Sequence, residues 1–241
     1  MRLFELDLTG RDAELVADRC WSAGAAGLWE VDAVTLRAGV DDDGAVTFMT
    51  ALADLEPADV TERHAVELAG RWSTVAVAGR ELELWVPPTV FGDGHHPTTA
   101  ACLELMPAAV GPGSSVLDVG CGAGALSLGA AVLGGEVTAI DLDPQAVAAT
   151  EANAVRNGLE VVTSPARLAD VPGRFDAVLA NMTSGALLPL VPDLVRVCAP
   201  GGALVLSGML EEQWPAVRAA AGGQVADVRM RDGWLTALTR R

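Results

Sequence analysis

The sequence contains no lysine and no tyrosine, so its 16 basic residues are all arginine. This absence excludes hydride chemistry that depends on a tyrosine–lysine pair, the pattern of short-chain dehydrogenases. Against 32 acidic residues, the arginines leave a formal net charge of −16. Such a surface repels phosphate backbones, which disfavours direct nucleic-acid binding, and it attracts basic proteins.

Histidine and cysteine are scarce as well. The cysteines show no C-x-x-C spacing and lie in apolar stretches, so we expect buried thiols and neither a disulfide nor a metal site. There are only three histidines, and two of them are adjacent, an arrangement that does not suit zinc. We therefore expect no metal. The cysteines are Cys20, Cys102, Cys121 and Cys198.

Long apolar runs are also missing. No stretch is long enough to cross a bilayer, and the first residues, MRLFELDLTGRD, lack the hydrophobic core of a signal peptide. The composition, 51% hydrophobic and 20% charged, is typical of a globular protein. We expect a cytoplasmic protein that makes no membrane contact.

Residues 114–143 organise the rest of the chain. They predict an apolar strand, a glycine turn, a helix, and a second apolar strand that ends in an acid. Gly120, Gly122 and Gly124 allow a sharp bend and the close approach of a ligand, and the helix directs its free N–H groups over the turn. Asp141 lies where a carboxylate accepts hydrogen bonds from a ribose. The stretch predicts a nucleoside-binding unit.

Two nucleoside cofactors match this unit. Gly120-x-Gly122-x-x-Ala125 satisfies the relaxed dinucleotide fingerprint and would suit NAD. Asp118 extends the pattern to D-x-G-x-G-x-G, which resembles motif I of class I S-adenosylmethionine (SAM) methyltransferases, where the early acid lies near the methionine amino group. The sequence offers no clear constellation for hydride transfer. We therefore favour SAM.

The remaining pattern predicts the fold. Apolar strands alternate with helices over residues 91–241, which indicates an α/β fold with a doubly wound, Rossmann-like parallel sheet. A closing hairpin about Asp232-Gly233 supplies an antiparallel C-terminal strand, as in class I methyltransferases. This hairpin supports SAM over NAD independently of the glycines.

The first 70 residues predict a small α+β, ferredoxin-like domain, followed by a linker over 71–90 and the main domain over 91–241. A family resemblance, given below, implies substrate recognition for the small domain and methyl transfer for the main one. The strand–helix–strand–strand order is completed by a helix and a further strand. The predicted elements are strands at 2–8, 24–32, 34–40, 46–52 and 65–69, and helices at 11–22 and 57–65.

Three segments resemble one family. FGDGHHPTT, residues 91–99, resembles the F-G-x-G-x-H-x-T-T signature of the ribosomal protein L-eleven (L11) methyltransferases, the PrmA family. VLDVGCGAGALSLGAA with AIDLDPQAVAATEANAVRNG resembles its SAM core, and DAVLANMTSGALLPLVPDL with APGGALVLSGML resembles its substrate side. The resemblance covers about residues 88–241. It is weaker before that, because residues 53–88 are shorter than the family's linker and carry their tryptophans at other positions.

The resemblance implies a function and a site. The function is transfer of methyl groups from SAM to a lysine ε-amine or an N-terminal α-amine of a basic protein, a ribosomal protein of the L-eleven type, with S-adenosylhomocysteine as product. The implied roles are Phe91, Gly92, Thr98 and Thr99 closing over SAM, Asp118, Gly120 and Gly122 at its methionine end, Asp141 at its ribose, and Asn181 beside both SAM and the acceptor nitrogen.

Other readings stay open at this point. The chain could be a class I methyltransferase for a different protein, a peptide or a small molecule, an NAD-binding oxidoreductase, or a SAM-binding module without catalysis. Asn181 also has a second reading, as a turn residue that caps the next helix.

Overall fold

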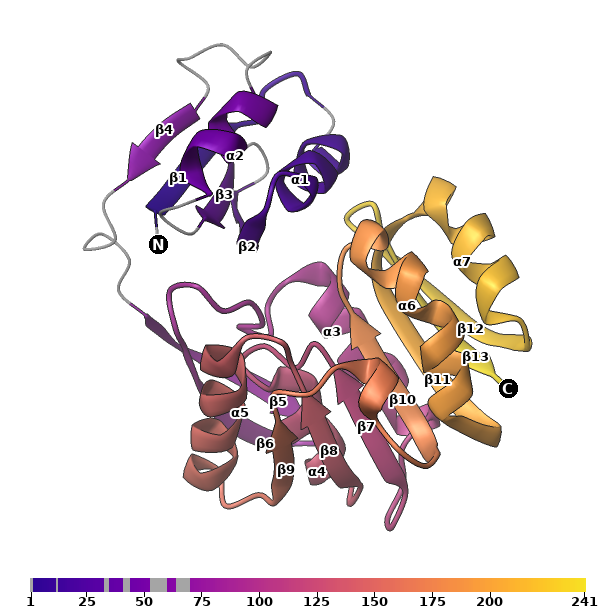
Figure 1. The fold of residues 1–241 in the computed structure, drawn as a ribbon. Helices are drawn as coiled ribbons and strands as arrows, with labels where there is room; N and C mark the ends of the chain where they lie inside the picture. Colours follow the sequence, from indigo (N-terminus) through magenta and orange to yellow (C-terminus); the bar gives the residue numbers. More distant parts are fainter. Residues whose placement is uncertain (1, 12, 33–34, 41–43, 53–59, 64–69) are drawn as a thin grey trace. The chain divides into compact units, whose positions relative to one another are not determined.

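The computed structural model describes residues 2–11, 13–32, 35–40, 44–52, 60–63 and 70–241. The chain divides into two compact units (Figure 1). Unit 1 comprises Met1–Gly70 with Pro88–Phe91, and unit 2 comprises Arg71–Pro87 with Gly92–Arg241. No helix within the described ranges is long and apolar enough to cross a membrane.

Within its described residues, unit 1 contains a four-stranded antiparallel sheet with the order β2-β3-β1-β4 and two helices. The elements follow one another as β-α-β-β-α-β, the order of a ferredoxin-like fold. The rings of Phe4 and Phe48 meet in its core with centroids 5.2 Å apart. The elements are β1 (Arg2–Asp7), α1 (Ala13–Ser22), β2 (Ala25–Asp32), β3 (Thr35–Val40), α2 (Ala45–Ala51) and β4 (Val60–Arg63).

Two of the secondary-structure predictions for this region are wrong. The segment predicted as a strand at 46–52 lies in helix α2 (Ala45–Ala51) and its C-cap Leu52, because Ala45, Phe48 and Leu52 recur at helical spacing and are all buried. The valine, threonine and phenylalanine of this segment favour strands intrinsically, but burial of one helical face prevails. The helix expected at 57–65 is contradicted by strand β4 at Val60–Arg63, and the strand expected at 65–69 lies outside the described residues.

Unit 2 is built on a seven-stranded sheet with the order β12-β13-β11-β10-β7-β8-β9 (Figure 1). The strands from β11 to β9 are parallel, and β13 and β12 add an antiparallel hairpin, which confirms the predicted sheet. The strands are β7 (Ser115–Val119), β8 (Glu136–Ile140), β9 (Val161–Ser164), β10 (Phe175–Asn181), β11 (Cys198–Leu210), β12 (Gln224–Arg231) and β13 (Trp234–Arg240).

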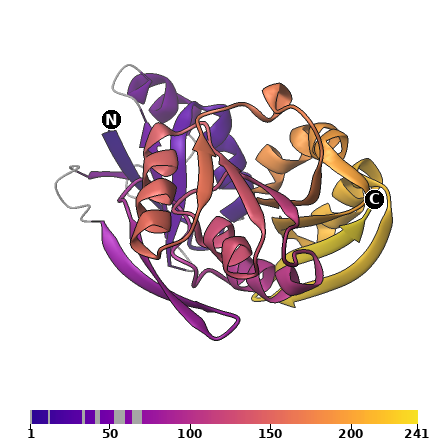
Figure 2. The same cartoon turned by 90° about the horizontal axis from the view of Figure 1, so that it is seen from below.

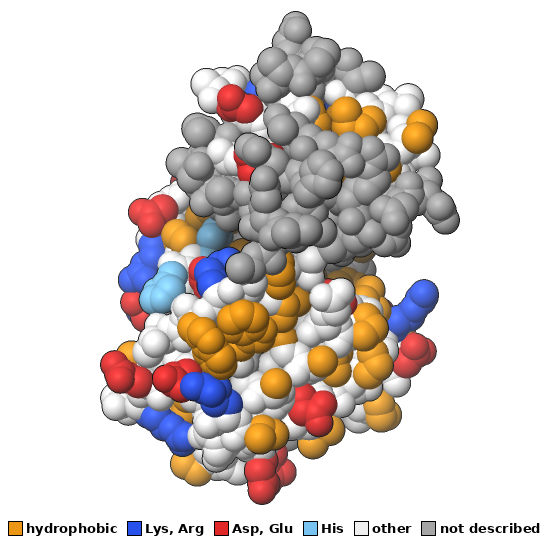
Figure 3. Space-filling model, turned by 90° about the vertical axis from the view of Figure 1, so that its left-hand side faces the viewer, with side chains coloured by type: hydrophobic (Ala, Val, Ile, Leu, Met, Phe, Trp, Pro, Cys, Tyr) orange, Lys and Arg blue, Asp and Glu red, His pale blue; other side chains and the backbone are white. Residues whose placement is uncertain are grey.

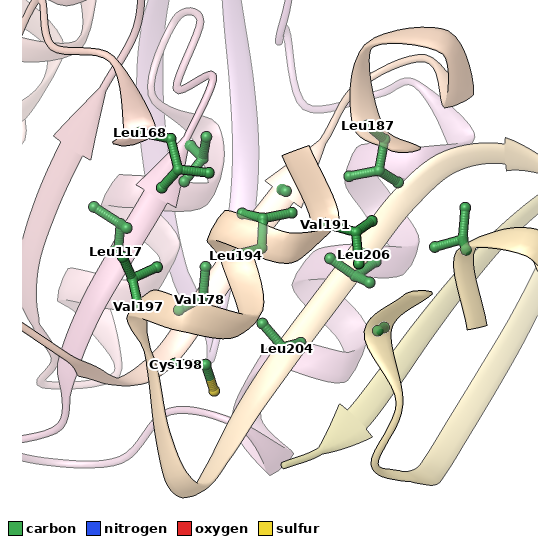
Figure 4. Packing of buried hydrophobic residues seen from close by; sticks show 14 of the residues in the cluster. Leu117, Leu168, Val178, Leu187, Val191, Leu194, Val197, Cys198, Leu204 and Leu206 are labelled. Atoms are coloured by element: carbon green, nitrogen blue, oxygen red, sulfur yellow. The ribbon is translucent and has the colours of Figure 1, made fainter. Parts of the chain in front are cut away.

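Helices cover both faces of this sheet (Figures 1 and 2). One core lies under α6 and α7, where Leu187, Val191 and Leu194 pack on the sheet (Figure 4). A second core lies under α3 and α4, and alternate residues of β7 enter the two cores. The helices are α3 (Pro97–Leu105), α4 (Ala125–Val132), α5 (Pro144–Arg156), α6 (Ser184–Val197) and α7 (Trp214–Ala221), with 3₁₀ turns η3 (Met106–Ala108), η4 (Leu168–Asp170) and η5 (Glu211–Gln213).

The segment expected to be a linker, 71–90, contains an antiparallel hairpin that is separate from the main sheet (Figure 2). Its strands are β5 (Arg71–Val77) and β6 (Arg80–Val86). The hairpin buries the side chains of one face, including Val75 and Leu84, and residues Arg71–Pro87 group with unit 2. It is therefore a structural part of the unit that holds the glycine turn.

Candidate active site

The glycine turn connects the carboxyl end of β7 to helix α4. Gly120, Gly122 and Gly124 have φ angles of 75°, 55° and 90°, values that favour glycine strongly. A Cβ atom on Gly124 would lie 3.0 Å from Thr150 Oγ1, so a larger residue there would also crowd Thr150. The Gly120 amide donates a hydrogen bond to the carbonyl of Ile140 at 2.8 Å. The turn is thereby fixed against the end of the neighbouring strand β8.

Asp141 lies immediately beyond β8 and faces this turn. Its carboxylate accepts hydrogen bonds from the backbone N–H groups of Gly122 and Asp143, both at 3.0 Å. Burial raises the pKa of Asp141, while these hydrogen bonds act in the opposite direction. The structure therefore brings together Asp141 and the turn, two parts of the predicted site that are about 20 residues apart in the sequence.

Asp118 is buried in β7, with only 1% of its surface exposed. Its Oδ2 accepts a hydrogen bond of 2.5 Å from the hydroxyl of Ser127 on α4. Burial raises the pKa of the Asp118 carboxyl to about 7, although the Ser127 bond lowers it, and the charge of Asp141 adds to the increase. Ser127 was missed from the sequence, where its only signal is a polar residue within an otherwise apolar helix.

The pKa of Asp118 predicts how its replacement alters stability. An unfolded aspartate ionises near pH 4, whereas Asp118 in the folded chain ionises near pH 7. The wild-type chain therefore loses stability as the pH rises between these values, because the unfolded state releases its proton first. We expect Asp118→Asn to melt at the wild-type temperature near pH 4 and roughly 5 °C higher at pH 8, measured by circular dichroism.

Asp176 provides a control for which the pH dependence of stability has the opposite sign. It is exposed and accepts hydrogen bonds from the Ser115 amide and hydroxyl, which lower its pKa. Its stabilisation is present above about pH 4 and is lost below it, so Asp176→Asn should melt below the wild type at pH 8. A difference between Asp118→Asn and wild type that does not change with pH would contradict the buried, protonated carboxyl.

Asn181 lies at the carboxyl end of β10, next to Ser207 of β11. Its Nδ2 donates a hydrogen bond of 3.2 Å to Oγ1 of Thr99, a residue of α3 that is only 2% exposed. The amide is thus oriented by a residue 82 positions away, and its Oδ1 is available to accept a hydrogen bond from a ligand. The interpretation of Asn181 as a helix cap is wrong, because the N-cap position of α6 is held by Thr183, whose side chain makes no capping hydrogen bond.

The loop before α3 approaches the glycine turn closely. Gly92 has a φ of 107°, and a Cβ atom there would lie 3.4 Å from the backbone nitrogen of Ala123. A Cβ atom on Gly94 would lie 1.9 Å from Val75 Cγ2, so the loop also lies directly against β5. Asp93 forms an ion pair of 2.8 Å with Arg71 of the same strand. The hairpin β5–β6 therefore holds this loop in place.

The two threonines of the loop signature use their side chains differently. Thr99 bonds Asn181, as described above, whereas the hydroxyl of Thr98 lies 2.7 Å from Nδ1 of His96. His96 is the N-cap of α3, and its ring meets Trp234 edge-on at 5.5 Å. His96 thus has a capping and packing role. Phe91 belongs to segment Pro88–Phe91 of unit 1, and its closure over SAM stays a prediction.

Met182 links the strand end to the glycine turn and was missed from the sequence. A Cβ atom on Gly120 would lie 3.2 Å from its terminal methyl group. Its backbone is fixed by Gly208, where a Cβ atom would lie 2.1 Å from the Met182 carbonyl oxygen. Since Met182 follows Asn181 directly, this packing places the end of β10 beside the turn. The only sequence signal was that adjacency.

The parallel sheet with its antiparallel C-terminal hairpin, the glycine turn and the acid after β8 define the fold of the class I SAM-dependent methyltransferases. The chain belongs to the family described as ribosomal protein L11 methyltransferase (PrmA), which matches residues 41–241. The preference for SAM over NAD and the family resemblance are thereby confirmed.

Individual relatives agree with this assignment. The chain is 43% identical over 169 residues to the ribosomal protein L11 methyltransferase of Azotobacter vinelandii, covering 68% of this chain and 58% of that protein. It is 36% identical over 223 residues to that of Dechloromonas aromatica, covering 90% of this chain and 73% of that protein. The chain thus spans little more than half the length of the first of these relatives.

Solved structures show the same fold. The ribosomal protein L11 methylase of Lactobacillus delbrueckii subsp. bulgaricus is 31% identical with a TM-score of 0.58, over 61% of this chain and 81% of that chain. A T. thermophilus 16S rRNA N2 G1207 methyltransferase, solved with AdoMet and guanosine, has a TM-score of 0.61 over 100% of this chain and 64% of its own. Its identity of 18% shows likeness of fold alone.

Proposed function

We propose that the chain is a SAM-dependent N-methyltransferase that modifies ribosomal protein L11 on lysine ε-amines, on the N-terminal α-amine, or on both. The observation that carries this proposal is Asn181, a strand-end amide whose Nδ2 is occupied by Thr99 and whose Oδ1 is left for an amine donor. Membership of the L11 methyltransferase family supports the substrate.

The residues around the turn suit SAM. Gly120 and Gly122 admit the methionine end, because neither residue has a side chain of its own to place between the turn and a ligand. Asp141 retains acceptor capacity for the ribose beyond its two backbone hydrogen bonds. Its carboxylate, and the carboxyl group of Asp118 in its ionised form, also complement a cofactor that carries an ammonium and a sulfonium group. Phe91, Gly92, Thr98 and Thr99 would close over the bound molecule.

The chemistry requires alignment more than activation. SAM, when bound, supplies an electrophilic methyl group on its sulfonium. Asn181 Oδ1 accepts a hydrogen bond from the neutral substrate amine and so directs the nitrogen lone pair toward the methyl group. Exclusion of water lowers the pKa of the amine, which loses its proton to solvent before transfer.

Charge supports a basic protein as the substrate. The net charge of −16 creates a field that attracts lysine-rich surfaces. On the face drawn in Figure 3, the described acidic side chains are scattered among arginines and form no single cluster. Attraction would therefore be long-range, and we assign selection of the substrate to the small unit formed by residues 1–70.

Labelled SAM tests the proposed function. We expect the full chain to label one protein, L11, in a complete lysate and to label nothing at that mass in a ribosome-deficient lysate. The Asn181→Ala variant should transfer no label in parallel. Label on a different protein would indicate a methyltransferase with another substrate. Binding of SAM without transfer to any protein would indicate a non-catalytic SAM-binding module.

A further inference from the structure

Two asparagines on α5 and just beyond its end, one turn apart, pair with the backbone of strand β6. Asn153 accepts a hydrogen bond from the Trp85 amide at 2.8 Å and donates one to the Trp85 carbonyl at 2.9 Å. Asn157 repeats the pattern with Glu83, at 3.0 Å and 2.8 Å. The residues they pair with are two apart, as in a strand ladder, so the two side-chain amides take the place of a neighbouring strand.

Asn153 makes one bond that Asn157 does not. Its Nδ2 also donates to the carbonyl of Ala123, in the glycine turn, at 2.9 Å. Asn153 is 1% exposed, and both of its donors and its acceptor are used within the protein. The same side chain therefore joins the hairpin and the cofactor turn.

Thr150 bonds the carbonyl of Gly122, which immediately precedes that of Ala123 in the turn. Its Oγ1 donates to Gly122 at 2.9 Å, so two successive carbonyls of the turn face α5. In a trans peptide the carbonyl and the following N–H point in opposite directions. The bond from Thr150 thus directs the Ala123 N–H away from α5, toward the side where Gly92 of the loop approaches.

The hairpin connects to that loop as well. Ser73 donates to the carbonyl of Asp93 at 2.6 Å, and Arg71 pairs with the Asp93 carboxylate. The loop before α3 is thus held by the hairpin, and Asn153 bonds both the hairpin and the turn.

We propose that Asn153 is a positioning residue for cofactor binding, which sets the glycine turn and the loop at the separation that SAM requires. The inference rests on the proposed function in that SAM is the ligand. It goes beyond it because Asn153 lies behind the turn, and because the resemblance assigns no role to Asn153 although the residue falls within the segment that resembles the family's SAM core.

Three variants of the full chain separate positioning from ordinary structural support. Asn153→Ala removes contacts to both the hairpin and the turn. Asn157→Ala removes the equivalent contacts to the hairpin and a bond to the Asn153 backbone carbonyl, but no contact to the turn. Thr150→Val removes a contact to the turn and none to the hairpin. Each is titrated with S-adenosylhomocysteine by calorimetry, its melting temperature is recorded, and KM for SAM and kcat are measured.

We expect Asn153→Ala to raise the Kd for S-adenosylhomocysteine and the KM for SAM about tenfold, with kcat at saturating SAM near wild type. Thr150→Val should raise the same Kd and KM severalfold. Asn157→Ala should leave them within twofold, even though its melting temperature falls about as far as that of Asn153→Ala.

Equal Kd values for Asn153→Ala and Asn157→Ala at similar melting temperatures would overturn the assigned role and leave the proposed function intact. If Asn153→Ala does not fold, the Thr150→Val variant serves as the test. An affinity for S-adenosylhomocysteine equal to that of the wild type in this variant would overturn the positioning role. A wild-type chain that binds neither SAM nor S-adenosylhomocysteine would overturn the proposed function, and the positioning role with it.

Discussion

Replacing Asn181 with alanine is expected to lower kcat for protein methylation by about 10²- to 10³-fold, the cost typical of removing one hydrogen-bonding group at a reacting centre. The affinity for SAM should stay within about twofold of wild type. The reason is geometric, because the Asn181 amide is held by Thr99 with its Oδ1 free to orient the amine. Single-turnover kinetics with labelled SAM measure the step, and equilibrium titration measures the binding.

Thr99 supplies the matched control for this experiment. Thr99→Ser keeps the hydroxyl that accepts the bond from Asn181 and should retain most of the wild-type kcat, whereas Thr99→Val releases the amide and should lose about tenfold. Loss of SAM binding in Asn181→Ala in proportion to the loss of turnover would contradict the role of Asn181 toward the substrate.

Replacing Asp141 with alanine is expected to weaken SAM binding about 100-fold. The change removes the acceptor proposed for the ribose and also the carboxylate that receives the Gly122 amide at 3.0 Å, so a direct contact and the shape of the turn are lost together. Calorimetric titration with S-adenosylhomocysteine measures the effect without turnover.

Asp143 is the control, because it is a neighbouring acid with a purely structural bond. It caps α5 by accepting a hydrogen bond from the Gln145 amide at 2.8 Å. Asp143→Ala should lose about 1 kcal/mol of stability, as for other helix caps, and keep its affinity for SAM. Similar Kd values for Asp141→Ala and Asp143→Ala would show that Asp141 does not face the cofactor.

The large sheet and the turn were predictable because their signals are local. Apolar strands alternate with helices, and the positions of Gly120, Gly122 and Asp141 follow from one short motif. Helix α2 was not predictable in this way, because its valine, threonine and phenylalanine favour strands and only burial of Ala45, Phe48 and Leu52 selects the helix.

The connections within the site could not be predicted from spacing. Asn181 meets Thr99 across 82 residues, and Asn153 meets Trp85 across 68. In the sequence, Asn153 and Asn157 look like the solvated face of an amphipathic helix. They are covered because the hairpin β5–β6, expected as part of a linker, packs against that helix. Long-range packing of this kind leaves no periodic signal.

The docking of this hairpin on α5 also sets an order of assembly. Residues 71–86 leave the ribosome well before residues 153–157, and a two-stranded hairpin alone is marginally stable in water. During synthesis the hairpin can contact α4 first, and about 70 residues must follow it before α5 exists. The loop before α3 contacts the hairpin through Asp93 and Gly94, so its support is complete only when α5 has docked. The glycine turn of the proposed cofactor site therefore receives its supporting bonds from α5, a helix that is synthesised after the turn itself.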